Sequence, residues 1–304
     1  MDLSIIVVSY NTRELLGDCL TSIAETVGDL ACETIVVDNA SSDGSAPMVR
    51  RYFPGVRLIR SPANCGFAAA NNLGIAASRG RQVLLLNSDA VLLPGTARAM
   101  VDFLDAHPGA GMVGAQLLNP DGSFQYSYAD FPSLTGELLL LTRLAPMVYT
   151  PTYPSYPLER SVQERSVDWV SGACLMARRA TIDAIGPLDE SYFMYTEETD
   201  WCYRARRGGW SVHYLPEAAV VHWGGQSAAA APARRRRQVY RSKRLFLRKH
   251  VGWWAAATFA LAVRAVSAFK LGAVAAVALA APDGDRRARA RHAMHSYALV
   301  LTGL

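Results

Sequence analysis

Residues 82–95 read QVLLLNSDAVLLPG, and this stretch decides which fold the sequence predicts. The apolar run 83–86 stops at the triplet Asn87-Ser88-Asp89, and a second apolar stretch follows it. A continuous apolar run between turn residues is typical of a strand that is covered on both faces of a sheet. A carboxylate at the end of such a strand lies where open α/β sheets bind ligands, but Asn, Ser and Asp are also ordinary turn residues. Asp89 is therefore either a ligand-binding residue or a turn residue.

Strands and helices alternate along the chain on both sides of this stretch. The other strands expected in the first half cover Leu3–Ser9, 34–37, 56–59 and 112–118. The expected helices begin at Asn11 or Thr12, after the turn at 41–44, at Gly66 and at Thr96. Alternation at this spacing predicts a mostly parallel, doubly wound α/β sheet with helices on its flanks.

The alternation stops after residue 122. Residues 124–166 are rich in Tyr, Pro and Ser, which predicts a long functional loop or a lid. Further elements are expected at 167–177 (a strand), 180–185 (a short helix) and 218–221 (a strand). We therefore expect one α/β body over 1–230, with halves 1–118 and 119–230, followed by a helical extension over 231–304.

The composition limits the class of protein. Of the 304 residues, 51% are hydrophobic and 19% are charged, which excludes a disordered chain and a polytopic membrane protein. Residues 234–291 hold 15 of the 31 Lys and Arg but only two of the 26 Asp and Glu, so the remainder carries a net charge of −8. The five cysteines form no CxxC pair and are expected to be mainly core residues of a reducing compartment, and no secretory signal is expected.

The basic tail admits three interpretations: a solvated helix face, a nucleic-acid patch or an anionic membrane surface. An apolar stretch follows it over 251–281, but its longest charge-free run, 251–263, is shorter than the ~20 residues of a membrane span. Helices in the membrane interface or a shallow hairpin are therefore expected, with a helical subdomain packed on the body or on a second subunit as the alternative. Nucleic-acid binding is the least favoured, because it leaves the apolar half of the tail unexplained.

Two polar segments of the second half are candidates for chemistry. The run EETDWCYRARRGG over 197–209 has carboxylates in its first turn and arginines in its last turn, as any stable helix can have. One of its glutamates could instead project into a cleft as a general base. His222 follows the apolar residues 218–221, and it becomes a candidate metal ligand only if an acidic residue from elsewhere meets it.

Taken together, seven motifs in order resemble the family 2 glycosyltransferases, which are inverting enzymes of the GT-A fold, and in particular the bacterial rhamnosyltransferase-like branch. The resemblance covers about residues 3–250. The motifs are SIIVVSYN at the start, VVDNASSDGS at 36–45, NCGFAAANN at 64–72, LLLNSDA at 84–90, WVSGACLMARR at 169–179, the EETDWCYRARRGGW run and the VVHWGG run.

The resemblance implies a role for each matching position. Asp89 corresponds to the DxD carboxylate that binds a divalent metal, Mg²⁺ or Mn²⁺, and His222 to a histidine that also reaches the metal in some members. Glu198 corresponds to the general base. The residues implied to bind the nucleotide sugar are Ser9, Tyr10, Asp38, Asn64, Gly66, Phe67, Asn87 and Ser88. Acceptor or supporting roles are implied for Trp169, Gly172, Glu197 and Asp200.

This sequence departs from the family pattern at two positions. The DxD motif opens with Asn87 in place of Asp, and the base is Glu198 where Asp is commoner, so that Glu197 is the alternative base. The implied chemistry suits the residue types, because a metal held by hard oxygen ligands neutralises a diphosphate leaving group. One carboxylate is then enough to take the proton of the acceptor hydroxyl.

The resemblance implies a metal-dependent, inverting transfer of a sugar, with rhamnose as the first guess, from a nucleotide diphosphate to a growing, lipid-linked cell-surface glycan. Two alternatives stay open: transfer of galactofuranose or another hexose, and a catalytically inactive homologue that serves as a membrane-bound assembly partner. The expected location is cytoplasmic, on the inner face of the cell membrane, with residues 234–291 on anionic lipid. The oligomeric state is left open, a homo-oligomer included.

Overall fold

The computed structural model describes all residues except 143, 145–162, 225–231, 281–283 and 304. It divides into two compact units. The first comprises residues 1–131, 154–193 and 197–227. The second comprises residues 132–153, 194–196 and 228–304, so that two short segments from the middle of the chain group with its C-terminal part.

The first unit is built on a ten-stranded sheet. Eight strands follow one another in the order β3 (Arg57–Arg60), β2 (Cys32–Asp38), β1 (Leu3–Ser9), β4 (Gln82–Asn87), β11 (Cys174–Arg178), β6 (Ala110–Leu118), β12 (Ser211–His222) and β5 (Ala90–Leu92). Two short strands extend it: β7 (Phe124–Gln125) pairs with β6, and β9 (Arg165–Ser166) pairs with β12. The predicted mostly parallel sheet is confirmed, with β11 and β5 running antiparallel to their neighbours.

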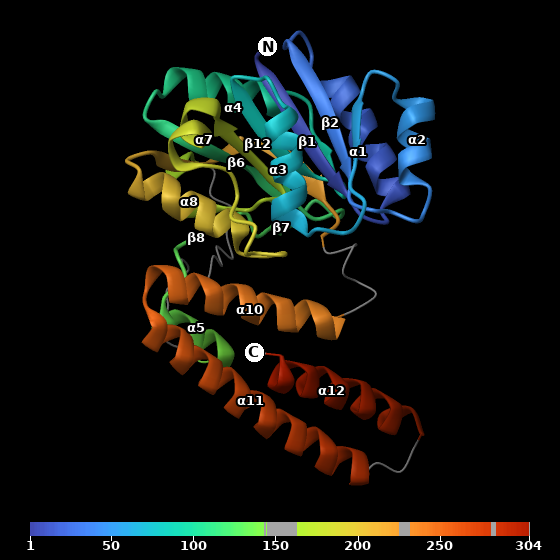
Figure 1. Ribbon diagram of the computed structural model, residues 1–304, viewed down its shortest axis with the longest axis vertical. Coiled ribbons are helices and arrows are strands. Elements are labelled where there is room, and N and C mark those ends of the chain that lie inside the picture. Colours follow the sequence, from blue (N-terminus) through green and yellow to red (C-terminus); the bar gives the residue numbers. More distant parts are fainter. Residues whose placement is uncertain (143, 145–162, 225–231, 281–283, 304) are drawn as a thin grey trace. The chain divides into compact units, whose positions relative to one another are not determined.

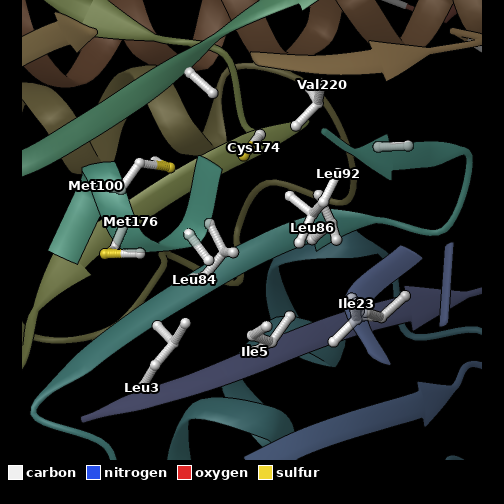
Figure 2. Close-up of a cluster of buried hydrophobic side chains, with 14 of the residues drawn as sticks. Leu3, Ile5, Ile23, Leu84, Leu86, Leu92, Met100, Cys174, Met176 and Val220 are labelled. Atoms are coloured by element: carbon white, nitrogen blue, oxygen red, sulfur yellow. The ribbon is translucent and has the colours of Figure 1, made fainter. Parts of the chain in front are cut away.

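Helices cover both faces of this sheet (Figure 1). They are α1 (Arg13–Thr26), α2 (Ser45–Tyr52), α3 (Phe67–Ala77), α4 (Thr96–Ala106), α7 (Arg179–Ile185) and α8 (Glu197–Arg207). Successive strand residues point to opposite faces, so Leu84 and Leu86 join the cluster with α1 and α4, while Val83 and Leu85 join the cluster with α3 and α8. Figure 2 shows the first of these clusters, with Leu84 and Leu86 beside Ile5.

The cysteines mostly belong to this core, as predicted. Cys19, Cys174 and Cys202 are buried and all five thiols are free. Burial raises the pKa of the Cys174 and Cys202 thiols to about 12, which keeps them protonated and unreactive near neutral pH. Cys65 is the exposed one.

Three predicted elements differ from those observed. The single strand expected over 167–177 is wrong, because a turn at 171–173 divides it into β10 (Trp169–Val170) and β11. The loop or lid expected over 124–166 contains β7, β8 (Tyr128–Ala129), α5 (Leu134–Thr142) and β9, and its residues 143 and 145–162 lie outside the described residues. The strand expected at 218–221 is the end of the much longer β12, whose pairing with β6 shifts register between Leu215 and Ala219.

The second unit is helical. Its helices are α5, α10 (Pro232–His250), α11 (Trp253–Ala280) and α12 (Gly284–Thr302), and Figure 1 shows α11 and α12 side by side. Leu141, Leu247, Phe259 and Val300 form its core. A shallow hairpin over 251–281 is not observed, because Trp253–Ala280 forms the one continuous helix α11, and the expectation of a helix in the membrane interface stays a prediction. In the described part of the chain, Trp253–Ala278 is one helix with the length and hydropathy of a membrane span.

Candidate active site

The turn between β4 and β5 lies beside the end of β12. Because β12 pairs antiparallel with β5, His222 lies opposite Ala90, and the backbone N–H of Trp223 donates to the carbonyl of Asp89 at 3.0 Å. This register brings Nε2 of His222 to 3.2 Å from Oδ1 of Asp89. Both side chains are almost fully buried, with 9% and 7% of their residue surfaces exposed. His222 is a candidate metal ligand only if an acidic residue from elsewhere in the chain meets it, and Asp89 is that residue.

Asn87 completes this cluster. Its Nδ2 lies 3.2 Å from Nε2 of His222, whereas its Oδ1 is buried without a hydrogen-bond partner among the described residues. The distance between Asp89 and His222 is close to the ~3 Å that separates neighbouring ligands of an octahedral ion with bonds of about 2.1 Å. The donor set therefore fits Mg²⁺ or Mn²⁺, although the described residues contain no group of three or more His, Cys, Asp or Glu able to hold a metal.

Asp38 lies at the same edge of the sheet, at the end of β2 and opposite Ser9 at the end of β1. Its side chain is 1% exposed, and Oδ1 accepts a hydrogen bond from the backbone N–H of Ser41 at 3.2 Å. Oδ2 is buried and has no hydrogen-bond partner in the described part of the chain, and the Nε of Arg60 lies 3.7 Å from it. One carboxylate oxygen is thus left available at the carboxyl ends of two parallel strands, where such sheets bind nucleotides.

Asn39 shapes the neighbouring loop, although no sequence pattern singles it out as a site residue. Its Oδ1 accepts from the backbone N–H of Cys65 at 3.0 Å, and its Nδ2 donates to Oδ1 of Asn64 at 3.1 Å. These bonds hold the turn before α3, where Gly66 has a φ of +89°. A Cβ at Gly66 would lie 2.4 Å from the carbonyl oxygen of Phe193, so only glycine fits this position.

A row of buried hydroxyl groups links the two ends of the site. Ser9 Oγ lies 3.1 Å from Thr12 Oγ1, which in turn lies 2.9 Å from Ser88 Oγ. Tyr10, which follows Ser9, is half-buried. The predicted nucleotide-binding strand end at Ser9 and the triplet that contains Asp89 are therefore connected through Thr12.

Glu198 is half-buried in the first turn of α8, close to Gly172. A Cβ at Gly172 would lie 3.4 Å from Cβ of Glu198 and 3.7 Å from Cε1 of Phe67. The next residue, Ala173, accepts a hydrogen bond from the backbone N–H of Asn87 at 3.0 Å. The turn 171–173 thus lies between the end of β4 and the start of α8, and it places Glu198 at the edge that carries Asn87.

The other acidic and aromatic candidates have structural contacts. Asp200 is fully buried and pairs with Arg204 at 2.9 Å, within α8. Burial, followed by the charge of Asp200, raises the pKa of the neighbouring Tyr192. Glu197 is also buried, and Trp169 donates from Nε1 to the carbonyl oxygen of Asp130 at 2.9 Å. These contacts anchor α8 and β10 and so support the position of Glu198.

Gln125 is the second residue at this site that sequence reasoning missed. It lies in the segment expected to be a loop or lid, and its Oε1 is 2.6 Å from Nδ1 of His222. A lone glutamine in a polar segment carries no pattern from which this contact could be predicted. Only the pairing of β7 with β6 brings it to the end of β12.

Comparisons with known proteins agree with this geometry. The family model described as "Glycosyl transferase family 2" matches residues 4–186. The N-acetylglucosaminyl-diphospho-decaprenol L-rhamnosyltransferase of Mycobacterium tuberculosis is 33% identical over 269 residues, which cover 84% of this chain and 87% of the relative. Rhamnosyltransferase WbbL of Escherichia coli is 22% identical over 227 residues, 72% of this chain and 82% of the relative.

The fold has solved counterparts. The mannosyltransferase PcManGT from Pyrobaculum calidifontis, solved in complex with GDP-Man and Mn²⁺, aligns with a TM-score of 0.56 over 99% of this chain and 86% of its own, at 19% identity. S. aureus TarS, residues 1–349, aligns with a TM-score of 0.53 over 99% of this chain and 81% of its own, at 16% identity. These likenesses show the GT-A fold, and the chain belongs to glycosyltransferase family 2, in its rhamnosyltransferase-like branch.

Proposed function

We propose that this enzyme transfers a sugar, with L-rhamnose as the first candidate, from a nucleotide diphosphate to a hydroxyl of a lipid-linked cell-envelope glycan, with inversion at the anomeric carbon. The observation that carries the proposal is the meeting of Asp89 and His222 at the sheet edge that also carries Asp38 and Glu198. The relative from Mycobacterium tuberculosis, named for rhamnosyl transfer to a decaprenol-linked sugar, supports the choice of donor and acceptor class.

Asp89 and His222 would hold a divalent cation, Mg²⁺ or Mn²⁺. When bound, that cation supplies charge neutralisation for the departing nucleotide diphosphate. The neutral amide of Asn87 adds no charge to the site, but its Nδ2 donates to His222 and so helps to fix the ring. With two ligands from the described residues, such a cation would keep further coordination positions for diphosphate oxygens and water.

The donor and acceptor sides follow from the same edge. Asp38, Ser9 and the half-buried Tyr10 would contact the nucleotide, and the loop at 64–67 would line the donor cleft. Glu198 would take the proton of the acceptor hydroxyl. Because Gly172 has no side chain, the space beside the methylene carbons of Glu198 stays open for that acceptor.

We also propose that the second unit holds the enzyme on the anionic inner face of the membrane. The exposed side chains of α11 are mostly apolar, with Arg264 among them, and they include Trp253, Leu261, Phe269 and Val277, each more than 60% exposed. The neighbouring α10 is densely basic. An apolar face next to a cationic helix is typical of binding to anionic lipid, where a lipid-linked acceptor is held.

Release of nucleotide tests the proposed reaction. The full chain is assayed with dTDP-rhamnose and UDP-galactofuranose, with a polyprenyl-diphosphate-linked acceptor and with Mn²⁺, Mg²⁺ or EDTA. We expect turnover to need the metal and Asp89→Ala to lower it by about 10³-fold or more, because several kcal/mol of leaving-group stabilisation are lost. The exposed Asp102→Ala of α4 serves as the matched control.

Two outcomes would redirect the proposal. Full turnover by the Asp89→Ala protein would show that the metal assignment is wrong. A complete lack of turnover with every donor, while Mn²⁺ and nucleotide still bind, would favour the inactive assembly partner.

A further inference from the structure

The side-chain amide of Gln125 contacts His222 at two points. Its Oε1 lies 2.6 Å from Nδ1 of the imidazole, and its Nε2 donates to the backbone carbonyl of His222 at 3.0 Å. The same Nε2 donates to Oδ1 of Asn119 at 2.8 Å. Gln125 is fixed in turn by the sheet, because it pairs with Leu117 of β6.

These contacts determine which way the amide faces. The carbonyl of His222 is a backbone acceptor, and Asn119 presents its oxygen because its own Nδ2 donates to Ser123 at 2.9 Å. The NH₂ group of Gln125 must therefore point to these two acceptors, which leaves Oε1 towards the imidazole. Since Oε1 can only accept, Nδ1 of His222 must carry a proton.

The tautomer of His222 follows directly. In the neutral ring with a proton on Nδ1, Nε2 has a free lone pair, and the hydrogen bond that Asn87 donates to Nε2 agrees with this assignment. Oδ1 of Asp89 is 3.2 Å from the same Nε2. Two acceptors at this distance repel each other, and a divalent cation held by Asp89 and His222 would relieve that repulsion.

We propose that Gln125 is a positioning residue that holds His222 as the Nδ1–H tautomer and directs the Nε2 lone pair to the cation site. A histidine that ligates a metal commonly donates its other N–H to an acceptor of this kind, and loss of the acceptor typically weakens metal binding 10- to 100-fold. The part of the proposal that concerns metal binding rests on the proposed function. The part that concerns the tautomer does not.

Nuclear magnetic resonance of the metal-free full chain at pH 8, with ¹⁵N in its six histidines, tests the tautomer. His222→Ala identifies the resonances of His222. We expect a protonated Nδ1 and an unprotonated Nε2 in the wild type. In Gln125→Met, which is similar in length but cannot accept, we expect a mixture of both tautomers.

Titration with Mn²⁺ alone, with free Mn²⁺ measured by electron paramagnetic resonance, tests the effect on the site. Gln125→Met should weaken binding about 10- to 100-fold. In the His222→Ala background, Gln125→Met should cause no further loss, because the glutamine acts through that ring. Gln82→Met, which removes the buried glutamine at the other end of β4, is the control and should bind Mn²⁺ normally.

The results that overturn the proposal are distinct from failure of the proposed function. A wild-type His222 with its proton on Nε2, or an unchanged tautomer in Gln125→Met, would disprove the positioning role whether or not Mn²⁺ binds. A full additional loss of Mn²⁺ affinity in the double variant would do the same. A wild type that shows the expected tautomer but binds no Mn²⁺ would remove the metal from the proposed function and leave Gln125 as the residue that fixes the ring.

Discussion

The sheet edge of the first unit and the outer side of α11 in the second unit are built on opposite principles. At the sheet edge, buried polar side chains hold one another in place, as Asp89, His222 and Gln125 do. On α11, large apolar side chains such as Leu261 and Phe269 are exposed, and the described window of this helix is only 17% buried. The polar side chains of the first surface contact one another in water and need only their ligands in addition. The second exposes apolar surface of the kind that marks sites of interaction with proteins or membranes.

After the loss expected for Asp89→Ala, the largest effect is expected at Glu198. Glu198→Gln removes the base but keeps the size of the side chain, so transfer should fall by about 10²- to 10³-fold while the donor still binds. Turnover and thermal shift with the nucleotide sugar measure the two quantities. The neighbouring Glu197→Gln is the matched control, and a loss of transfer in that variant alone would move the base to Glu197.

The next effect concerns α11. The double variant Leu261→Ser and Phe269→Ser should lower partitioning to vesicles rich in anionic lipid by about 10- to 100-fold, because two large side chains no longer enter the apolar phase. Co-sedimentation with vesicles of anionic and of neutral lipid measures it. Tyr52→Ser, an exposed aromatic of α2 in the first unit, should have no effect. Equal partitioning of the double variant and the wild type would contradict the membrane proposal.

A smaller effect, on stability, is expected at Gly66. Gly66→Ala forces a side chain into a conformation that suits glycine and places its Cβ 2.4 Å from the carbonyl oxygen of Phe193. We expect the free energy of unfolding to fall by about 2–4 kcal/mol. Gly95→Ala is the comparison, since Gly95 also has a positive φ but no atom within 4 Å of an added Cβ, and it should cost only about 1 kcal/mol. Equal losses in urea unfolding would show that the contact with Phe193 adds nothing.

The smallest change concerns the thiols. A thiol reagent should modify the exposed Cys65 quickly and leave the buried Cys174 and Cys202 unmodified, because their raised pKa keeps them protonated. The rate of modification in native buffer measures this difference, and Cys65→Ser should remove the fast phase. Fast modification of more thiols in that variant would show that the core opens readily.

Most of the fold could be predicted from local sequence patterns. The apolar run before Asn87 and the acidic start of α8 are continuous in sequence, so the strand and the helix could both be predicted. The division of 167–177 was missed because the apolar run continues through Gly172. The break falls where the chain leaves its pairing with β8 and begins its pairing with β4.

The site was predicted less completely than the fold. Asp89 and His222 belong to recognisable segments, and their contact agrees with the prediction that the two would meet. Asn39 and Gln125 could not be selected, because their importance comes from partners that lie 26 and 97 residues away in the chain. A role that depends on register between distant strands leaves no mark in the local sequence.

The buried hydroxyl row from Ser9 through Thr12 to Ser88 has a consequence for engineering. A library that varies Ser9 or Thr12 to accept a different nucleotide would also disturb the segment that carries Asp89, so selectivity and turnover would be lost together. Arg60 lies outside this row. Its side chain is 57% exposed and pairs with the carboxylate of Asp38. Under the proposed function, in which Asp38 would contact the nucleotide, Arg60 is therefore the position at which to seek a change of donor specificity.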